Sequence, residues 1–237
     1  MRIANNLILI LILLSATFQS CWVVDDDNIN AICSSDCTTI QGKFTTKDGN
    51  TPVGDMRLEF DWSITGVSGL SGRIRKIAVT QTDDNGNYKI LFFANEEELT
   101  TGHYLMRFYV PDNSYITRQN HAYFEIGINK RDTIVTRNYH IPKKGATINV
   151  KITNPEALTE DDNMVCNLSY KFDDLSKQIR YGVGSLFSQY SSEGTYSTAA
   201  GQYTYIQVLK KKNGEYFNNS DSVKIGLNEI VNYEVEF

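Results

Sequence analysis

The sequence is short of the residues from which metal and catalytic sites are built. Its 237 residues include three histidines, His103, His121 and His140, and none has a second ligand at metal-binding spacing. There is also no His-Glu-x-x-His pattern, no Gly-x-Ser-x-Gly elbow and no phosphate-binding glycine loop. We therefore expect no metal, no cofactor, no catalytic residues and no enzymatic activity. Carboxylates far apart in the sequence could still meet as an acid and a base, which spacing does not exclude.

Oxygen-rich turns are the feature that most resembles a cation site. Asp83, Asp84 and Asn85 carry the oxygen ligands that calcium takes, but no glutamate completes a loop of the EF-hand kind. Residues 160–162 share this composition. Both segments are interpreted as plain turns.

Concentrated positive charge is missing as well. The chain has 23 lysines and arginines against 28 aspartates and glutamates, a formal net charge of -5. The lysine triplet at residues 210–212 precedes Asn213 and Gly214 and is typical of a charged hairpin end. Without a basic patch that could follow a phosphate backbone, we expect no nucleic-acid partner.

The apolar run near the start is too short to span a membrane. Residues 7–14 are all apolar, whereas a span takes about 20 residues. Arg2 precedes this run, and small residues within 15–20 lead to Cys21. A basic end, a short apolar segment and a small residue before a cleavage point predict a secretory signal peptide of residues 1–20.

Residues 18–21, Phe-Gln-Ser-Cys, resemble the lipobox of bacterial lipoproteins in its relaxed Bacteroidetes form, although the leucine of the first position is absent. The resemblance implies a lipid on Cys21 and attachment to the membrane, with several acyl chains contributing about 0.8 kcal/mol per buried methylene. The alternative is an ordinary secreted protein, cut near Ser20, whose Cys21 forms a disulfide.

The acidic run after Cys21 bears on localisation. Asp25, Asp26 and Asp27 resemble the surface-export signal of Bacteroidetes lipoproteins, which implies the outer face of the outer membrane. The alternative is a solvated acidic spacer. Residues 21–37 lack periodicity and are predicted to be a flexible lipidated tether, which would reach roughly 50 Å when fully extended.

Three other cysteines remain in the mature chain. Cys33 and Cys37 could form a disulfide in an oxidising compartment. Cys166 shares alternate positions with apolar residues, which favours a buried, inert thiol.

The rest of the chain alternates between apolar and polar residues with the period of β-strands. Leu58, Phe60 and Trp62 give one example, and similar runs cover residues 104–110, 148–152 and 231–237. Turn residues separate the runs. Only residues 94–100 suggest a short helix, so the predicted fold class is all-β.

A boundary between two domains is predicted at residues 141–145, where proline, two lysines and glycine interrupt two strand-like runs. The predicted domains are residues 38–142 and residues 145–237, each of normal domain size. We expect two β-sandwiches in tandem after the signal peptide.

Three motifs between residues 40 and 140 occur in the order and spacing of a known family. They are a glycine-containing strand with a turn and a proline at residues 42–53, an acidic turn at residues 82–88, and a Gly-His-Tyr strand start at residues 102–104. This part resembles the carboxypeptidase regulatory-like domain. The resemblance implies a transthyretin-like, or prealbumin-like, sandwich that acts as a non-catalytic spacer, folding aid or docking surface.

Two tripeptides resemble the O-glycosylation pattern of Bacteroidetes. Residues 132–134 would carry the sugar on Thr133, and residues 221–223 would carry it on Ser222. The alternative is that both are ordinary strand residues.

The whole arrangement looks like an accessory lipoprotein of Bacteroidetes, with other outer-membrane proteins as partners. The first hypothesis is a binding or scaffold component of a glycan-uptake assembly, with residues 185–201 as a candidate binding loop. The alternative is a fimbrial anchor or adhesin subunit, which should expose or donate a strand. Residues 231–237 are the candidate strand.

Overall fold

The computed structural model describes residues 21–236 except 27, 48, 66–70, 118–120, 158, 173–176, 180–184 and 188–191. The predicted signal peptide, Asp27 and Phe237 lie outside the described residues. In the described part the chain is all-β, with strands in several sheets and two 3-10 turns, which confirms the predicted fold class. No helix within it has the length and apolar character that crossing a bilayer requires.

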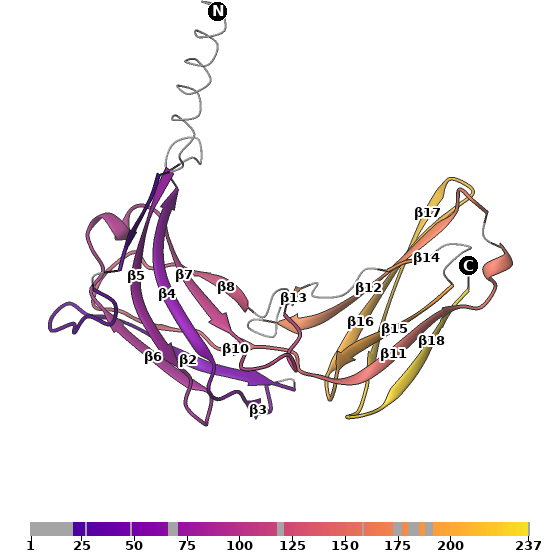
Figure 1. Ribbon diagram of the computed structural model, residues 1–237, viewed down its shortest axis with the longest axis horizontal. Coiled ribbons are helices and arrows are strands. Elements are labelled where there is room, and N and C mark those ends of the chain that lie inside the picture. Colours follow the sequence, from indigo (N-terminus) through magenta and orange to yellow (C-terminus); the bar gives the residue numbers. More distant parts are fainter. Residues whose placement is uncertain are drawn as a thin grey trace, which may run out of the picture.

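The first lobe is a sandwich of two sheets (Figure 1). One sheet has the order β1-β5-β4-β7-β8, and the other has the order β10-β2-β3, with β6 and β9 also paired to β2. The strands are β1 (Cys21–Asp25), β2 (Thr38–Thr46), β3 (Thr51–Pro52), β4 (Arg57–Thr65), β5 (Ser71–Gln81), β6 (Asn87–Phe92), β7 (His103–Tyr109), β8 (His121–Ile126), β9 (Ile134–Thr136) and β10 (Tyr139–His140).

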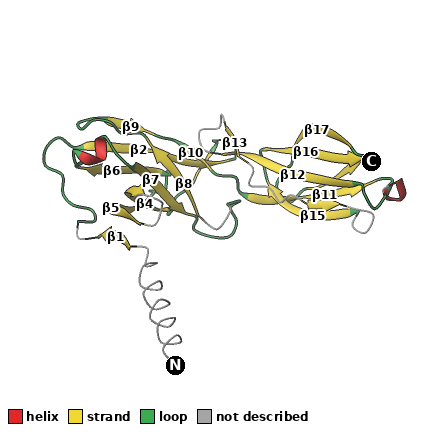
Figure 2. Ribbon diagram, turned by 90° about the horizontal axis from the view of Figure 1, so that it is seen from above, coloured by secondary structure: helices red, strands yellow, loops and turns green. Residues whose placement is uncertain are grey.

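The second lobe is a sandwich of the same kind (Figure 2). A three-stranded sheet, β15-β11-β18, faces a sheet with the order β13-β12-β16-β17, in which β14 also pairs with β12. The strands are β11 (Lys144–Ile152), β12 (Asn163–Phe172), β13 (Lys177–Ile179), β14 (Ser185–Phe187), β15 (Glu193–Ala199), β16 (Tyr203–Lys212), β17 (Glu215–Lys224) and β18 (Ile230–Val235). The 3-10 turns are η2 (Glu97–Leu99) and η3 (Pro155–Ala157).

Each lobe has its own hydrophobic core, built from the alternating residues that the sequence shows. Leu58, Phe60 and Trp62 of β4 are fully buried in the first core, and Ile148 and Val150 of β11 are fully buried in the second. Along the chain, the change from one core to the other falls between Ile141 and Ala146.

Two side chains cross between the lobes. Phe172, at the end of β12, belongs to the first core, where its ring centroid lies 5.5 Å from that of Phe124 and 6.1 Å from that of Phe108. Ile116 makes the reverse exchange into the second core. Each lobe therefore completes the other's core, and His140 and Gln202, both fully buried, join them by a hydrogen bond of 3.2 Å.

The first described residues form a strand, whereas the sequence predicts a flexible tether at residues 21–37. Residues Cys21–Asp25 form β1, which pairs in parallel with β5 from Ser71 to Arg75. Asn30 continues the attachment: its backbone N–H donates to Ile77 O at 2.9 Å, and its Oδ1 accepts from the backbone N–H of Val79 at 3.0 Å. The outer edge of β5 supplies backbone hydrogen-bond partners for β1, so residues 21–25 and Asn30 lie along the sandwich.

Candidate functional site

The acidic run after Cys21 lies at the edge of the first sheet. Asp25 is partly buried in β1, and an Asp26 carboxylate oxygen lies 3.1 Å from Lys76 Nζ. This ion pair is exposed and worth at most about 1 kcal/mol, and Asp26 stays accessible to solvent. Cys21 opens the strand, and the carboxylates follow within one strand length of the predicted lipid.

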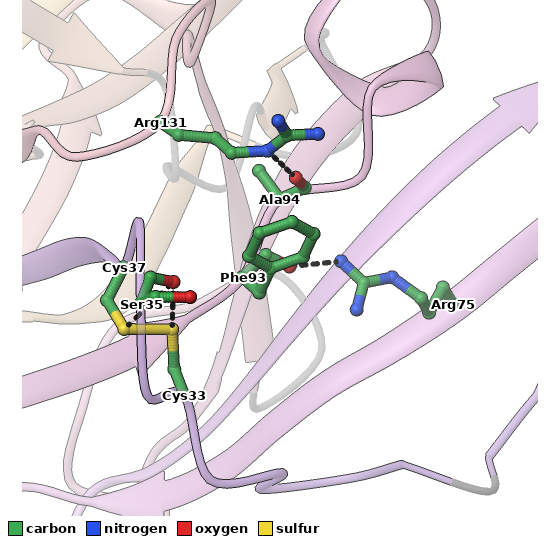
Figure 3. Close-up of a disulfide and its surroundings, with 7 residues drawn as sticks. All are labelled: Cys33, Ser35, Cys37, Arg75, Phe93, Ala94 and Arg131. Carbon is green, nitrogen blue, oxygen red and sulfur yellow. Dashed lines mark hydrogen bonds between the residues drawn. A yellow bond between two sulfur atoms is a disulfide. The ribbon is translucent and has the colours of Figure 1, made fainter.

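A disulfide joins Cys33 and Cys37 beside the first sandwich (Figure 3). Both sulfurs lie 3.5 Å from the carbonyl oxygen of Ser35, which the bridge encloses. The bridge closes a loop immediately before β2, where the irregular segment meets the sheet. Cys166 is buried in the second core, as its alternate position predicts, and burial raises the pKa of its thiol to about 11.

Three glutamates of the segment around η2 each pair with a different arginine. Glu98 is buried and receives bonds of 2.5 Å from Arg75 Nε and Nη2. The outer two pairs are Glu96 with Arg131 and Glu97 with Arg73. We call these six residues the Arg–Glu clasp. Figure 3 shows that Arg75 and Arg131 also donate to the carbonyl oxygens of Phe93 and Ala94, at 3.2 Å and 2.6 Å.

The clasp is a structural element. Tyr104 donates its hydroxyl to Glu98 at 3.2 Å, and burial together with this carboxylate raises the pKa of Tyr104 well above its usual range. Every polar atom of Glu98 is thus engaged by Arg75, Tyr104 or Asn95. The outer two glutamates, Glu96 and Glu97, are exposed, with side-chain exposures of 81% and 52%.

The predicted oxygen-rich turn is satisfied by its own backbone. Asp83 accepts from the N–H groups of Asn85 and Asn87 at 3.0 and 2.7 Å, and hydrogen bonding by Asn87 holds the pKa of Asp83 below its usual value. Gly86 has a positive φ of 76°, and a Cβ there would lie 2.4 Å from Phe44 O. The described residues contain no group of three or more histidine, cysteine or acidic side chains that could hold a metal ion.

A polar groove of about 540 Å³ lies beside this turn on the first lobe. Amide, lysine and hydroxyl side chains dominate its lining, which consists of Gln41, Gly42, Lys43, Gln81, Asp83, Asn87, Tyr88, Lys89, Thr136 and Asn138. Such side chains suit the hydroxyl groups of a glycan.

β17, the outer strand of the second lobe, is exposed along almost its whole length (Figures 1 and 2). β17 pairs with β16 over ten residues without a register shift, and its other edge has no strand partner among the described residues. All its residues are exposed except Val223, which is half-buried. Tyr216 is 80% exposed and Phe217 46%.

The predicted C-terminal strand is part of the fold. β18 pairs in parallel with β11 over six residues, and Val231, Tyr233 and Val235 pack on the second core. A strand with these contacts cannot leave the sheet without opening the core, so β18 does not fit the role of a strand donated to a neighbour.

The other predicted site residues do not gather in one place. Ser222 lies exposed on β17, whereas Thr133 lies in the first lobe, where its carbonyl oxygen accepts from Thr39. Of the predicted binding loop 185–201, residues Glu193–Ala199 form β15, and residues 188–191 lie outside the described part. His103 is exposed and lies 2.7 Å from Glu125, far from the buried His140.

No family model and no curated protein matches the chain. Among solved structures, the Bacillus anthracis TIE protein is 13% identical with a TM-score of 0.31, over 84% of this chain and 34% of its own. A candidate adhesin from Bacteroides ovatus is 10% identical with a TM-score of 0.30, over 89% and 95%. A streptococcal ancillary pilin is 11% identical with a TM-score of 0.30, over 85% and 63%.

The chain thus spans about a third of the first of these proteins. TM-scores at this level assign neither a family nor a function, and the resemblance to the carboxypeptidase regulatory-like domain stays a prediction.

Proposed function

We propose that this protein is a cell-surface adhesin or fimbrial subunit, anchored to the outer membrane through a lipid on Cys21, that joins a neighbouring protein by strand addition along β17. The observation that carries the proposal is the free edge of β17: ten residues in regular pairing with β16, with no proline and no bulge. Sheet edges in soluble proteins are usually short, bulged or otherwise protected, because an open edge invites another chain to pair.

The backbone of β17 defines which groups face a partner. Asn213 and Gly214, both with positive φ, form the two-residue turn that pairs Lys212 with Glu215. Because inward and outward hydrogen bonding alternates along an antiparallel strand, the N–H groups of the even-numbered residues, Ser220 among them, face outward. A partner strand would bond to these groups and contact the exposed Tyr216.

The edge is tested by Ser220→Pro. Proline removes the outward N–H and keeps the bonds to β16, so the variant should fold normally. It should lower incorporation of the protein into high-mass surface polymers, and its co-purification with neighbouring subunits, about tenfold, whereas Ser220→Ala should have no effect. Assembly of Ser220→Pro at the level of the parent chain would refute strand addition at β17.

The anchor is tested by Cys21→Ala, which removes the sulfur that a lipid would occupy. The variant should move from the membrane fraction to the soluble fraction. A second variant, with Asp25, Asp26 and Asp27 replaced by asparagine, should keep the lipid but resist protease added to intact cells. A Cys21→Ala protein that stays with the membrane rules out lipidation at this position.

The polar groove on the first lobe favours a second candidate function, the binding component of a glycan-uptake assembly. The amide and hydroxyl side chains that line the groove support this alternative. A glycan array with the intact protein separates the two functions. Glycan binding that is abolished by Asn138→Ala would support uptake. Absence of binding to every glycan on the array would remove the support for uptake. Genes for a nutrient receptor beside this one would favour uptake, and a fimbrial gene cluster would favour the adhesin.

A further inference from the structure

The exposed strand β17 has a sequence that is complementary to itself. Residues Glu215–Lys224 pair with β16 along one edge, and the other edge has no strand partner in the described part of the chain (Figure 1). Two identical strands can pair antiparallel across a two-fold axis, and every contact then occurs twice. The side chains of β17 decide whether such a pair is favourable.

The geometry of a sheet restricts where the axis can lie. Two residues that face each other across a sheet point to the same side of it, and side chains alternate between the two sides along each strand. A residue of even number must therefore face a residue of even number, and the axis passes at a residue that faces its own copy. The residues near the middle of β17, which allow the longest overlap, are Asn218, Asn219, Ser220 and Asp221.

An axis at Ser220 matches the apolar and aromatic side chains of the two copies. It places Phe217, which is 46% exposed, opposite the half-buried Val223 of the second copy, so that the ring gains apolar cover. On the other side of the sheet it places the exposed ring of Tyr216 opposite the ammonium group of Lys224, which is a favourable contact.

The polar side chains match at the same register. Asn219 lies opposite Asp221, so its side-chain amide can donate to that carboxylate, and Asn218 lies opposite Ser222. In the single chain the N–H of Ser222 donates to Asp221 Oδ1 at 2.7 Å, and pairing would transfer this bond to the carbonyl oxygen of Asn218 in the second copy. Within β17 no charged side chain faces another of the same sign.

The three neighbouring registers are less favourable. An axis at Asn219 places Phe217 opposite Asp221, which sets a carboxylate against an apolar ring. An axis at Asn218 places Glu215 opposite Asp221, and an axis at Asp221 places that carboxylate opposite its own copy. Like charges directly opposite each other destabilise a pair of strands. The side chains of β17 therefore favour one register.

We propose that β17 pairs with β17 of a second copy of this chain, antiparallel and with Ser220 on the two-fold axis. This pairing rests on the proposed strand addition at β17 and makes the neighbouring protein a second copy. The outward N–H and C=O groups would supply about ten backbone hydrogen bonds. Because such a contact closes on itself, β17 would join two copies, and each pair would enter larger assemblies as one unit.

Cysteine crosslinking of the full-length protein in detergent tests the register. Ser220→Cys would place two thiols on residues whose Cα atoms lie about 5.5 Å apart, within the range of a disulfide. Ser222→Cys is also exposed, but its two copies would lie about 14 Å apart along the strands. Under mild oxidation, Ser220→Cys should form a disulfide dimer at least tenfold faster than Ser222→Cys. The parent chain measures any crosslinking through its own cysteines.

The charge beside the axis provides a second measurement. In the Ser220→Cys protein, Asn219→Asp sets a second carboxylate opposite Asp221 in both contacts and should slow dimer formation about fivefold, whereas Asn219→Lys should accelerate it. The same two changes at Asn129, an exposed residue of the first lobe, should leave the rate unchanged.

The results distinguish self-pairing from strand addition by another protein. Equal rates in Ser220→Cys and Ser222→Cys, or effects at Asn129 as large as those at Asn219, would overturn the pairing of two copies. If Ser220→Pro still lowers co-purification with neighbouring subunits in that case, β17 receives a strand from a different protein and the proposed function stands. If Ser220→Pro assembles like the parent chain as well, both proposals are wrong.

Discussion

Asp61 shows how a single residue departs from its strand pattern. In β4 the alternation assigns Asp61 to solvent, yet it is 3% exposed, beside a register shift in the pairing of β4 with β5. Burial raises the pKa of Asp61, and Arg107, at 3.5 Å, opposes the rise. Arg107 belongs to the neighbouring strand β7, so periodicity in β4 could not predict this contact.

The burial of Cys166 predicts that the stability of the protein depends on pH. Its pKa in the folded protein is about 11, above the unfolded value of about 9, so its stabilising contribution is present below pH 9 and lost as the pH rises towards 11. The loss should be on the order of 1–3 kcal/mol. Urea unfolding at pH 8 and pH 10.5 measures it, and Cys166→Ala should show a smaller loss.

The thiol can be checked directly. Iodoacetamide at pH 8.5 should leave the native protein unlabelled and label one thiol per chain after unfolding, if Cys21 carries a lipid and Cys33 is bridged to Cys37. Rapid labelling of Cys166 in the native protein would contradict its burial.

At the scale of elements, the segment around η2 owes its shape to distant residues. The glutamates of residues 96–98 suggest a short helix in the sequence, and the structure forms the single 3-10 turn η2. Its partners Arg73 and Arg75 come from β5, and Arg131 comes from the segment before β9. These three ion pairs form only because the sheet brings distant residues together, so local helix propensity could not predict them.

The ion pairs of the Arg–Glu clasp should contribute unequally to the free energy of unfolding. Arg75→Ala would leave the buried Glu98 charge without its main partner and should cost about 3–5 kcal/mol of unfolding free energy. Arg73→Ala removes a half-exposed pair with Glu97 and should cost about 1 kcal/mol or less. Thermal and urea unfolding of the two variants measure the difference. Similar losses in both would mean that Glu98 is solvated.

Alternation in the sequence identifies strands that bury one face and misses strands that are exposed on both faces. β4, β7 and β11 bury one face each, and their alternation identifies them. β1 has no period because its partner β5 lies some fifty residues away, as the register of Cys21 with Ser71 shows. β17 is exposed on both faces, so its pattern carries no hydrophobic signal, and the free edge that supports the proposed function could only be found in the structure.

At the scale of the molecule, the two lobes are coupled by the exchange of Phe172 and Ile116. Alternation along β12 predicts that Phe172 is buried, but not that it enters the core of the other lobe. The hydrogen bond between His140 and Gln202 has the same origin, since it joins residues of different lobes. Contacts between the two lobes could not be predicted from the residue pattern of either lobe alone.

The coupling should appear in the unfolding of the protein. Phe172→Ala removes a fully buried ring and should destabilise the first lobe by about 3–5 kcal/mol. Calorimetry should then resolve two transitions where the parent chain shows one, because the lobes no longer share a core. Phe217→Ala, a half-exposed ring on β17, should change stability by about 0.5 kcal/mol or less. One unchanged transition in Phe172→Ala would show that other contacts join the lobes.

The docking of β1 has a mechanical consequence. A pulling force applied at Cys21 along the strand would load the five parallel β1–β5 residue pairs in shear, all at once, instead of peeling them one by one. Shear spreads tension over the whole ladder, and the disulfide between Cys33 and Cys37 stops extension within the loop behind it. If the protein is held at Cys21, a pulling force would therefore act on a stiff, hydrogen-bonded attachment instead of a flexible tether.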